Sequence, residues 1–372
     1  MIYFDSAATT KPSLGAINAA KDAIEIYGNP SSVHSAGING KKLLDNARKT
    51  VAKALSAKPE EIVFTSCGSE SNNQAIFGLA KLRVRRSKRI ITSDSEHPSV
   101  SSPLSVLEEE GWEIVRIPTV GGKLCLQTLE TQLSKGCAFV TIMLANNETG
   151  AKYDIASVRK AIDKSGCGAL FHCDAVQGFL KVGDKREIVK NCDLASISAH
   201  KVGGFKGVGA LYIKNGIKLP PFIRGGGQEN GLRSGTENIV GISAFAGAVE
   251  EFNGDVTNHI SRLYNYTASL LEKIDGVVLH IPESHVDSVL LISALGVRSE
   301  VMLNALNAEG ICVSAGSACS ARKGVTHAMQ SFGLSKEMLE SAVRISFGAE
   351  NTKEECEILA QKIEEALKRL KR

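Results

Sequence analysis

The sequence around Lys201 suggests a chemical role for this side chain. It lies in the segment DLASISAHKVGGFKGVG, where an apolar run passes through small residues into a glycine-rich stretch. A lysine amine among small residues at the end of a strand can reach a bound aldehyde without steric hindrance, as Schiff-base formation requires. Taken alone, Lys201 is better explained as a plain surface lysine, so the interpretation depends on other segments.

Two more polar residues follow apolar runs. Asp174 ends the run LFHCD, where a carboxylate must be paired or desolvated. An anion there could keep the pyridine nitrogen of a pyridoxal cofactor protonated, although capping of the next helix is a fair alternative. His97, in SDSEHPSV, could stack on such a ring and exchange protons, whereas a lone loop histidine is more often structural.

Residues 62–73, IVFTSCGSESNN, are compatible with a phosphate site. An apolar run leads through small residues into a helical pattern, which places backbone N–H groups where phosphate binds. The pattern is weak because many strand-to-helix turns share it. Arg344, in SAVRISFG, has apolar neighbours on both sides and needs a fixed anion. Bidentate pairing with an α-carboxylate is its best use, and an internal Asp or Glu is the alternative.

Cys319 lies in VSAGSACSARKG, a stretch of small residues between a predicted strand and a predicted helix. Small neighbours predict an accessible loop, and Arg322 and Lys323 favour the thiolate form of the cysteine. Most of the other cysteines are expected to be small buried hydrophobic residues. With nine cysteines and no C-x-x-C spacing, disulfides and a metal site are poorly supported, and a reduced, cytoplasmic setting fits best.

The elements that position these residues alternate between strand and helix. Amphipathic stretches such as 101–110 and 155–165 lie between mostly continuous apolar runs, which predicts an α/β fold. We expect a mostly parallel central sheet with helices on both faces. The predicted strands are 62–65, 89–93, 113–117, 139–144, 170–174, 194–198 and 210–213.

After about residue 255 the pattern changes to shorter strands mixed with helices, which indicates a smaller α+β domain. Its predicted strands are 277–281, 288–292, 311–314 and 343–346. The last helix has the clearest signals, because Thr352 and Glu355 form a capping-box pattern ahead of an apolar stripe. The stripe consists of Leu359, Ile363, Leu367 and Leu370.

Composition argues against several classes of protein. A net charge of +4 is too slight to indicate nucleic acid or a membrane as the main partner. The N-terminus has no signal-peptide pattern, and no run approaches the roughly 20 apolar residues of a membrane span. The basic run 81–89, KLRVRRSKR, is interpreted as a solvated helix end, with docking of an acidic partner or RNA as the alternative. With 5% aromatic residues, base stacking would have little to use.

Together these segments resemble the cysteine desulfurases, the NifS/IscS-like members of the class V aminotransferase family of fold-type I enzymes that depend on pyridoxal 5'-phosphate (PLP). The resemblance runs almost end to end and rests on many ordered motifs. They are YFDSAATT, GNPSSVH, TSCGSESNN, EHPSV, NNETG, HCDAVQ, SAHK, GGGQENGLRSGT, GSACSA and VRISFG. The resemblance implies a large PLP-binding domain at residues 14–255. Residues 1–13 and 256–372 would form a small domain that carries the catalytic cysteine loop.

The resemblance also implies a role for each residue. Lys201 would bind PLP covalently, Asp174 would pair with the pyridine nitrogen, and His97 would stack on the ring and shuttle protons. Arg344 would bind the substrate carboxylate, and Cys319 would be the catalytic cysteine. The other implied cofactor contacts are Gln177 and Asn147 beside the ring hydroxyl, with Asn147 also near the substrate, and Gly68, Ser69, Ser198 and His200 around the phosphate, with Thr236 from the second subunit of a homodimer.

The implied activity converts L-cysteine to L-alanine and leaves sulfur as a persulfide on Cys319. An iron–sulfur scaffold or a thiolation carrier would then accept the sulfur. A selenocysteine lyase or another PLP-dependent β-lyase is the alternative within the fold, and a non-catalytic docking scaffold is the alternative outside it. The chain departs from the family pattern at Cys67 and Ala199, where glycine or a similarly small residue is expected.

Overall fold

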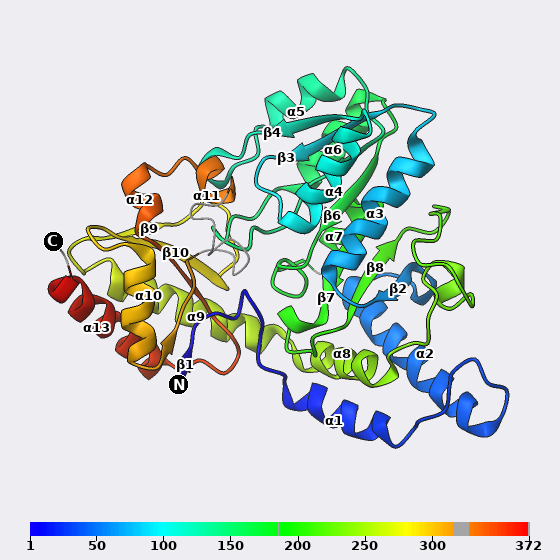
Figure 1. Cartoon of the computed structure of the whole chain (residues 1–372), viewed down its shortest axis with the longest axis horizontal. Helices are drawn as coiled ribbons and strands as arrows, with labels where there is room; N and C mark the ends of the chain where they lie inside the picture. Colours follow the sequence, from blue (N-terminus) through cyan, green and yellow to red (C-terminus); the bar gives the residue numbers. More distant parts are fainter. Residues whose placement is uncertain (185, 316–326, 371–372) are drawn as a thin grey trace.

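Residues 1–184, 186–315 and 327–370 are described by the computed structural model of the chain (Figure 1). They form a large seven-stranded sheet with helices packed against it, and a smaller group of strands and helices beside it. The strands of the large sheet lie in the order β2-β8-β7-β6-β5-β3-β4. Their bounds are β2 Ile62–Thr65, β3 Arg89–Ser93, β4 Glu113–Ile117, β5 Phe139–Thr141, β6 Leu170–Asp174, β7 Leu194–Ser198 and β8 Gly209–Ile213.

The large sheet is mostly parallel, as predicted. Strands β4, β3, β5, β6 and β7 run parallel to one another, whereas β8 runs antiparallel to both of its neighbours, β2 and β7. The carboxyl ends of the parallel strands therefore meet at one edge, the usual place for a ligand site in such sheets.

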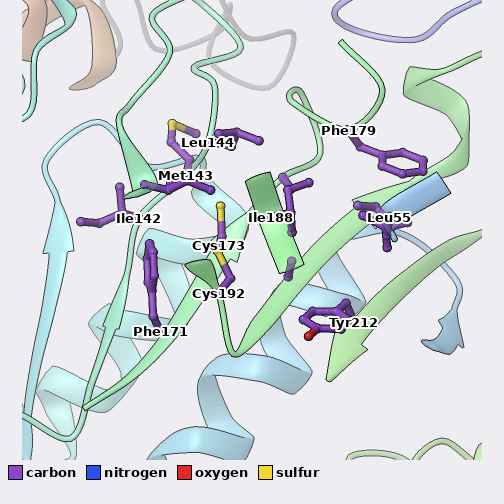
Figure 2. Close-up of a cluster of buried hydrophobic side chains, with 14 of the residues drawn as sticks. Leu55, Ile142, Met143, Leu144, Phe171, Cys173, Phe179, Ile188, Cys192 and Tyr212 are labelled. Carbon is purple, nitrogen blue, oxygen red and sulfur yellow. The ribbon is translucent and has the colours of Figure 1, made fainter. Parts of the chain in front are cut away.

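Helices cover both faces of this sheet because its strands are apolar on both sides. Within β2, Ile62 and Phe64 belong to one buried cluster, while Val63 between them belongs to another. Figure 2 shows part of the first cluster, including Phe171, Cys173 and Tyr212. The first cluster contains residues of α2 (Ser35–Leu55), α5 (Leu126–Leu133), α6 (Ile155–Ser165) and α8 (Ile239–Glu251), and the second contains residues of α3 (Gly68–Arg83) and α4 (Pro98–Glu109).

Most strand predictions for this sheet are confirmed at both ends, and three elements differ. Strand β8 begins at Gly209, one residue earlier than predicted. Strand β5 ends at Thr141, three residues earlier than predicted, although the backbone N–H groups of Ile142 and Leu144 still donate to carbonyl oxygens of β6. Helix α4 begins at Pro98 instead of residue 101. Proline is well suited to the first turn of a helix, so the histidine–proline pair marks a helix start and not a loop.

The smaller group contains a three-stranded antiparallel sheet in the order β12-β10-β9 and a short parallel pair, β1 with β11. Its buried cluster includes Phe4 from the N-terminal segment beside residues from beyond position 255. The domain limits stay a prediction. The bounds are β1 Ile2–Tyr3, β9 Val277–His280, β10 Val289–Ala294, β11 Ile311–Cys312, β12 Ala342–Ser346, α9 Gly254–Leu271, α10 Ser299–Ala308, α11 His327–Phe332, α12 Lys336–Glu340 and α13 Lys353–Leu370. Helices α1 (Leu14–Ile24) and α7 (Glu187–Asn191) complete the chain.

The predicted capping box of the last helix is confirmed. The backbone N–H of Glu355 donates to Thr352 Oγ1 at 3.3 Å, and the N–H of Thr352 donates to Glu355 Oε2 at 3.2 Å. Leu359, Ile363 and Leu367 are buried along one side of α13. This apolar side packs the helix against α9 and α10 in the buried cluster of the smaller group.

The basic run 81–89 is a helix end before a strand, as predicted, but three of its four arginines also bond within the fold. Arg83 donates to the carbonyl groups of Ala138 and Gly168, and Arg86 donates to that of Cys167. Arg89 pairs with Glu113 at 2.8 Å. These arginines therefore connect neighbouring loops within the fold. None of the helices in the described parts of the chain is long and apolar enough to span a bilayer.

Candidate active site

A cavity of about 230 Å³ opens at the carboxyl ends of β5, β6 and β7. It brings together all of the predicted site residues except Thr236 and Cys319, although they come from segments far apart in the chain. Its lining consists of Ala7, Ala8, Cys67, Gly68, Ser69, His97, Ser99, Met143, Ala145, Asn147, Asp174, Val176, Gln177, Ser198, His200, Lys201 and Arg344.

Lys201 reaches the cavity from a 3-10 turn, Ala199–Lys201, that follows β7 directly. Its Nζ donates to the carbonyl oxygens of Ala7 and Ala8, at 2.6 and 2.8 Å. The N-terminal segment thus holds the amine at the wall of the cavity through uncharged backbone carbonyl groups. An amine in this place is positioned for reaction with an aldehyde bound in the cavity.

Asp174 ends β6, and both of its carboxylate oxygens accept hydrogen bonds from uncharged donors. Asn72 Nδ2 donates to Oδ2 at 2.8 Å, and the N–H of Val176 donates to Oδ1 at 3.0 Å. The second bond means that capping of the following turn, the alternative interpretation, is also present. Neutral donors stabilise the carboxylate while leaving its charge available to a cationic group in the cavity.

Asn72 was missed by sequence reasoning. It lies on α3, is fully buried, and donates to Ser99 Oγ as well as to Asp174. The sequence did contain a signal for Asn72, because its amide lies one turn after the proposed phosphate loop, in SESNN. The side chain joins the start of α4 to the end of β6, so it fixes the Asp174 carboxylate.

His97 precedes α4 and caps its first turn. The N–H of Ser99 donates to His97 Nδ1 at 3.1 Å, so in the neutral ring the proton is on Nε2. Burial lowers the pKa of His97, Asp174 partly opposes this, and Lys201 lowers it further. A neutral imidazole therefore lines the cavity, with one N–H to donate.

The proposed phosphate loop begins helix α3. Cys67 Sγ accepts from the N–H of Glu70 at 3.5 Å, which leaves the N–H groups of Gly68 and Ser69 at the helix start. A Cβ at Gly68 would lie 2.7 Å from Val176 Cγ2, so only glycine fits there without movement. Ser198 Oγ, on the same cavity, is buried and has no hydrogen-bond partner. A phosphate group would satisfy these donors.

His200 also faces this part of the cavity and is held in its neutral form. Burial lowers its pKa to about 4, with Lys201 and other lysines adding to the effect. Its Nδ1 lies 3.2 Å from Thr9 Oγ1, and its carbonyl accepts from the N–H of Thr10. His200 thus ties the lysine-bearing turn to the N-terminal segment.

Arg344, in β12, is almost fully buried and has an internal acidic partner, which was the alternative interpretation. Its Nη2 donates to Asp5 Oδ1 at 2.6 Å and its Nη1 to the carbonyl oxygen of Asn147 at 2.9 Å. The remaining donor, Nε, is buried without a hydrogen-bond partner. Arg344 therefore keeps a donor for a ligand carboxylate, and Asp5 is a second residue that sequence reasoning missed.

Glu96 is a third missed residue, adjacent to His97. Its Oε1 accepts from Ser93 Oγ and from the N–H of Met143, at 2.5 and 2.9 Å, while Oε2 has no partner. Burial raises the pKa of Glu96 to about 8, and Asp174 adds to the effect. Near neutral pH this carboxyl is mostly uncharged, and it links the segments that carry His97 and Asn147.

Two predicted residues are not in this cavity. Thr236 lines a separate cavity of about 220 Å³ together with Ser66 and Arg233. Arg233 Nε donates to Glu70 Oε1 at 2.9 Å, so the cavity that Thr236 lines lies beside the first turn of α3. Cys319 falls outside the described residues.

The site fits PLP by its own chemistry. It offers an amine for the aldehyde, a carboxylate for the ring nitrogen, a neutral imidazole, and an unsatisfied hydroxyl beside a helix N-terminus for the phosphate.

Comparison with known proteins agrees with this geometry. The aminotransferase class-V family matches residues 2–359. A cysteine desulfurase IscS from Dictyoglomus turgidum is 37% identical over 380 residues, covering 100% of this chain and 95% of that protein. The solved structure of a NifS-like protein superposes with a TM-score of 0.92 at 34% identity, covering 99% of this chain and 100% of that one.

A second solved structure, SspA in complex with cysteine, has a TM-score of 0.83 at 30% identity, covering 95% of this chain and 100% of that one. These similarities extend over nearly the whole chain and include the sheet that positions the cavity. The expected fold type is therefore confirmed. The chain belongs to the aminotransferase class-V family, a class of PLP-dependent enzymes, as one of its NifS- and IscS-like cysteine desulfurases.

Proposed function

We propose that this cavity binds PLP and L-cysteine, and that the protein releases L-alanine while the sulfur passes to Cys319. The observation that carries the proposal is the placement of Lys201, Asp174 and Arg344 on one cavity. The amine of Lys201 suits the aldehyde, and the carboxylate of Asp174 suits the ring nitrogen. The guanidinium of Arg344, with its unpartnered Nε, suits the amino-acid carboxylate.

The fit assigns each part of PLP to residues of this chain. Lys201 would hold the aldehyde carbon, and Asp174 the protonated ring nitrogen. His97 would stack on the ring. The remaining contacts are Gln177 and Asn147 at the ring oxygen, and Gly68, Ser69, Ser198 and His200 at the phosphate. When bound, PLP withdraws electrons from the α-carbon of an amino acid attached to it.

Arg344 would orient the substrate by its carboxylate. Its Nε is free, while the bond from Nη1 to the Asn147 carbonyl fixes Asn147 next to the same group. One solved relative, SspA, is a complex with cysteine, which supports cysteine as the amino acid bound here.

Two groups are placed to move protons. The Lys201 amine can take a proton from the substrate α-carbon and return it, because hydrogen bonds to the carbonyl oxygens of Ala7 and Ala8 hold it on the cavity. His97 can donate its Nε2 proton, and its lowered pKa keeps the ring neutral between transfers.

Sulfur transfer requires a nucleophile, and Cys319 is the proposed one. Its thiolate attacks the sulfur of the bound cysteine, so an S–S bond forms and the substrate C–S bond breaks. The electron pair of that bond stays with the carbon skeleton, which takes up a proton and leaves as alanine. The persulfide on Cys319 can then be passed to an acceptor protein, an iron–sulfur scaffold or a thiolation carrier.

We further propose a homodimer in the cytoplasm. Thr236 lies in a cavity beside Ser66, just outside the proposed phosphate loop of its own chain. A contribution of Thr236 to the site of a second copy is compatible with this placement and explains why it is absent from the first.

The activity is tested by incubating purified protein anaerobically with L-cysteine and a thiol reductant, and quantifying alanine beside a Cys319→Ser variant. Alanine in excess of enzyme, lost in the variant, supports a desulfurase that works through Cys319. Alanine that persists in the variant indicates a lyase route or substitution by Cys67. PLP-loaded protein that forms no alanine contradicts the cysteine assignment, and selenocysteine is then the substrate to test.

A further inference from the structure

Lys181 is a partly buried lysine next to the site whose interactions the proposed chemistry does not use. It lies four residues after Gln177, in the segment between β6 and α7, and its Nζ donates to Gln177 Oε1 at 3.0 Å. Within the described parts of the chain, no carboxylate forms an ion pair with Lys181. The hydrogen bond to Gln177 therefore satisfies one donor of this lysine and joins it to the site.

The two partners of the Gln177 amide determine its orientation. Nζ of lysine presents hydrogens to Oε1, and the carbonyl oxygen of Ala7 can only accept, here from Gln177 Nε2 at 2.8 Å. The amide oxygen must therefore face Lys181, and the amide nitrogen must face Ala7. One N–H of Nε2 remains to be donated inside the cavity that Gln177 lines.

Lys181 acts from outside that cavity. It lines a second cavity, of about 410 Å³, which also contacts Lys201, Val202 and Phe347. Ala7 O accepts from Lys201 Nζ at 2.6 Å as well, so Lys181, Gln177, Ala7 and Lys201 form one chain of hydrogen bonds. Lys181 thus contacts the first cavity through the Gln177 amide, and its charge also acts on Lys201 and Arg344.

We propose that Lys181 is a positioning residue, which holds the Gln177 amide so that an N–H and not the oxygen faces the ring oxygen of the cofactor. The inference rests on the proposed binding of PLP in the first cavity. Burial, with Lys201 and Arg344 adding to it, lowers the pKa of Lys181 to about 7. Both the ammonium and the amine carry hydrogens to donate, so the bond to Oε1 persists on either side of this pH.

The test is a double-mutant cycle on PLP binding. Lys181→Met removes the donor while keeping an unbranched side chain, and Gln177→Ala removes the amide. Each apo-protein is titrated with PLP, and the pH dependence of the bound cofactor's absorbance is recorded. We expect Lys181→Met to weaken PLP affinity about tenfold and to shift the pH midpoint of the absorbance. Lys181→Arg, which keeps a cationic donor, should stay near wild type.

The decisive comparison is made on the Gln177→Ala background, where Lys181→Met should cause no further loss. An equal loss on both backgrounds, or an unchanged affinity and midpoint in Lys181→Met, overturns the inference while leaving the proposed function intact. Failure of the wild-type protein to bind PLP removes the proposed function itself. Should Lys181→Met not fold, Lys181→Leu, which also lacks a donor, takes its place, and the same comparison decides.

Discussion

Asp5 and Arg344 form a hydrogen-bonded ion pair of 2.6 Å, although they lie near opposite ends of the chain. The Arg344 side chain is 2% exposed, so the carboxylate of Asp5 is the anion that balances its charge. Removal of one partner from a buried pair leaves an uncompensated charge, which is the costly case for such pairs. The same arginine carries the free Nε proposed for the substrate.

We therefore expect Asp5→Ala to lower the free energy of unfolding by about 3 kcal/mol. Asp45→Ala is the control, because Asp45 also pairs with a cation, Lys41, but with side chains that are 42% and 54% exposed. That variant should lose less than about 1 kcal/mol. Urea unfolding of both variants measures the difference, and equal losses would contradict the assigned role of Asp5.

Glu96 predicts a pH dependence of stability. Its pKa is raised from 4.5 to about 8 by burial, so the folded protein binds more protons at this carboxyl than the unfolded chain between these values. The free energy of unfolding therefore falls as pH rises from about 4.5 to about 8. In Glu96→Gln the amide does not titrate, so this part of the pH dependence should disappear.

The measurement compares urea unfolding of wild type and Glu96→Gln at several pH values between 5 and 9. Wild type should lose stability relative to the variant as pH increases. The amide oxygen of the variant still accepts from Ser93 and from the N–H of Met143, so folding is expected to be retained. A difference between the two proteins that is constant with pH would show that Glu96 is ionised in the folded state.

The strands and the cavity residues at their ends were predictable because both depend on local signals. Short apolar runs such as Ile90–Ile91 in β3 pass into small or polar residues at the strand end, as in many buried parallel strands. Parallel strands bring their carboxyl ends together, so the proximity of Asp174 and Lys201 could be predicted from the strands alone. The start of α4 was placed three residues late, because a proline that begins a helix resembles a loop residue.

Pairs that depend on tertiary packing were not predictable. Nothing near Asp5 indicates Arg344 as its partner, and nothing near Glu96 indicates that Met143 will satisfy one of its oxygens. Lys181 has the spacing of an ordinary helical neighbour of Gln177. Its effect on the amide orientation depends on Ala7, which is brought there by the N-terminal segment.

Asp174→Asn tests the charge next to the proposed ring nitrogen. The two donors that hold Asp174, from Asn72 and Val176, each use a different carboxylate oxygen, and an amide offers only one. The variant loses the anion and one acceptor, so alanine formation should fall by at least about 100-fold. Asp193→Asn is the control, since Asp193 is also buried but precedes β7 at the other end of the strand. Retention of activity in Asp174→Asn would exclude the proposed role.

Gly68→Ala tests whether the start of α3 must approach Val176 closely. The added Cβ would lie 2.7 Å from Val176 Cγ2, so the helix N-terminus and Val176 must move apart, which disturbs the proposed phosphate site. We expect PLP affinity, measured by titration of the apo-protein, to weaken about tenfold, a loss typical of one displaced hydrogen bond. Gly254→Ala, with no atom within 4 Å of the new Cβ, should bind PLP as wild type does.

A second substitution that removes the clash should restore PLP affinity. In the double variant Gly68→Ala with Val176→Ala, the opposing methyl groups are absent, and the next neighbour of the new Cβ is Ser198 Cβ at 3.5 Å, an ordinary contact. Most of the lost PLP affinity should therefore return, even though Val176→Ala alone removes packing. If the two substitutions instead add, the loss in Gly68→Ala comes from the helix backbone and not from the contact with Val176.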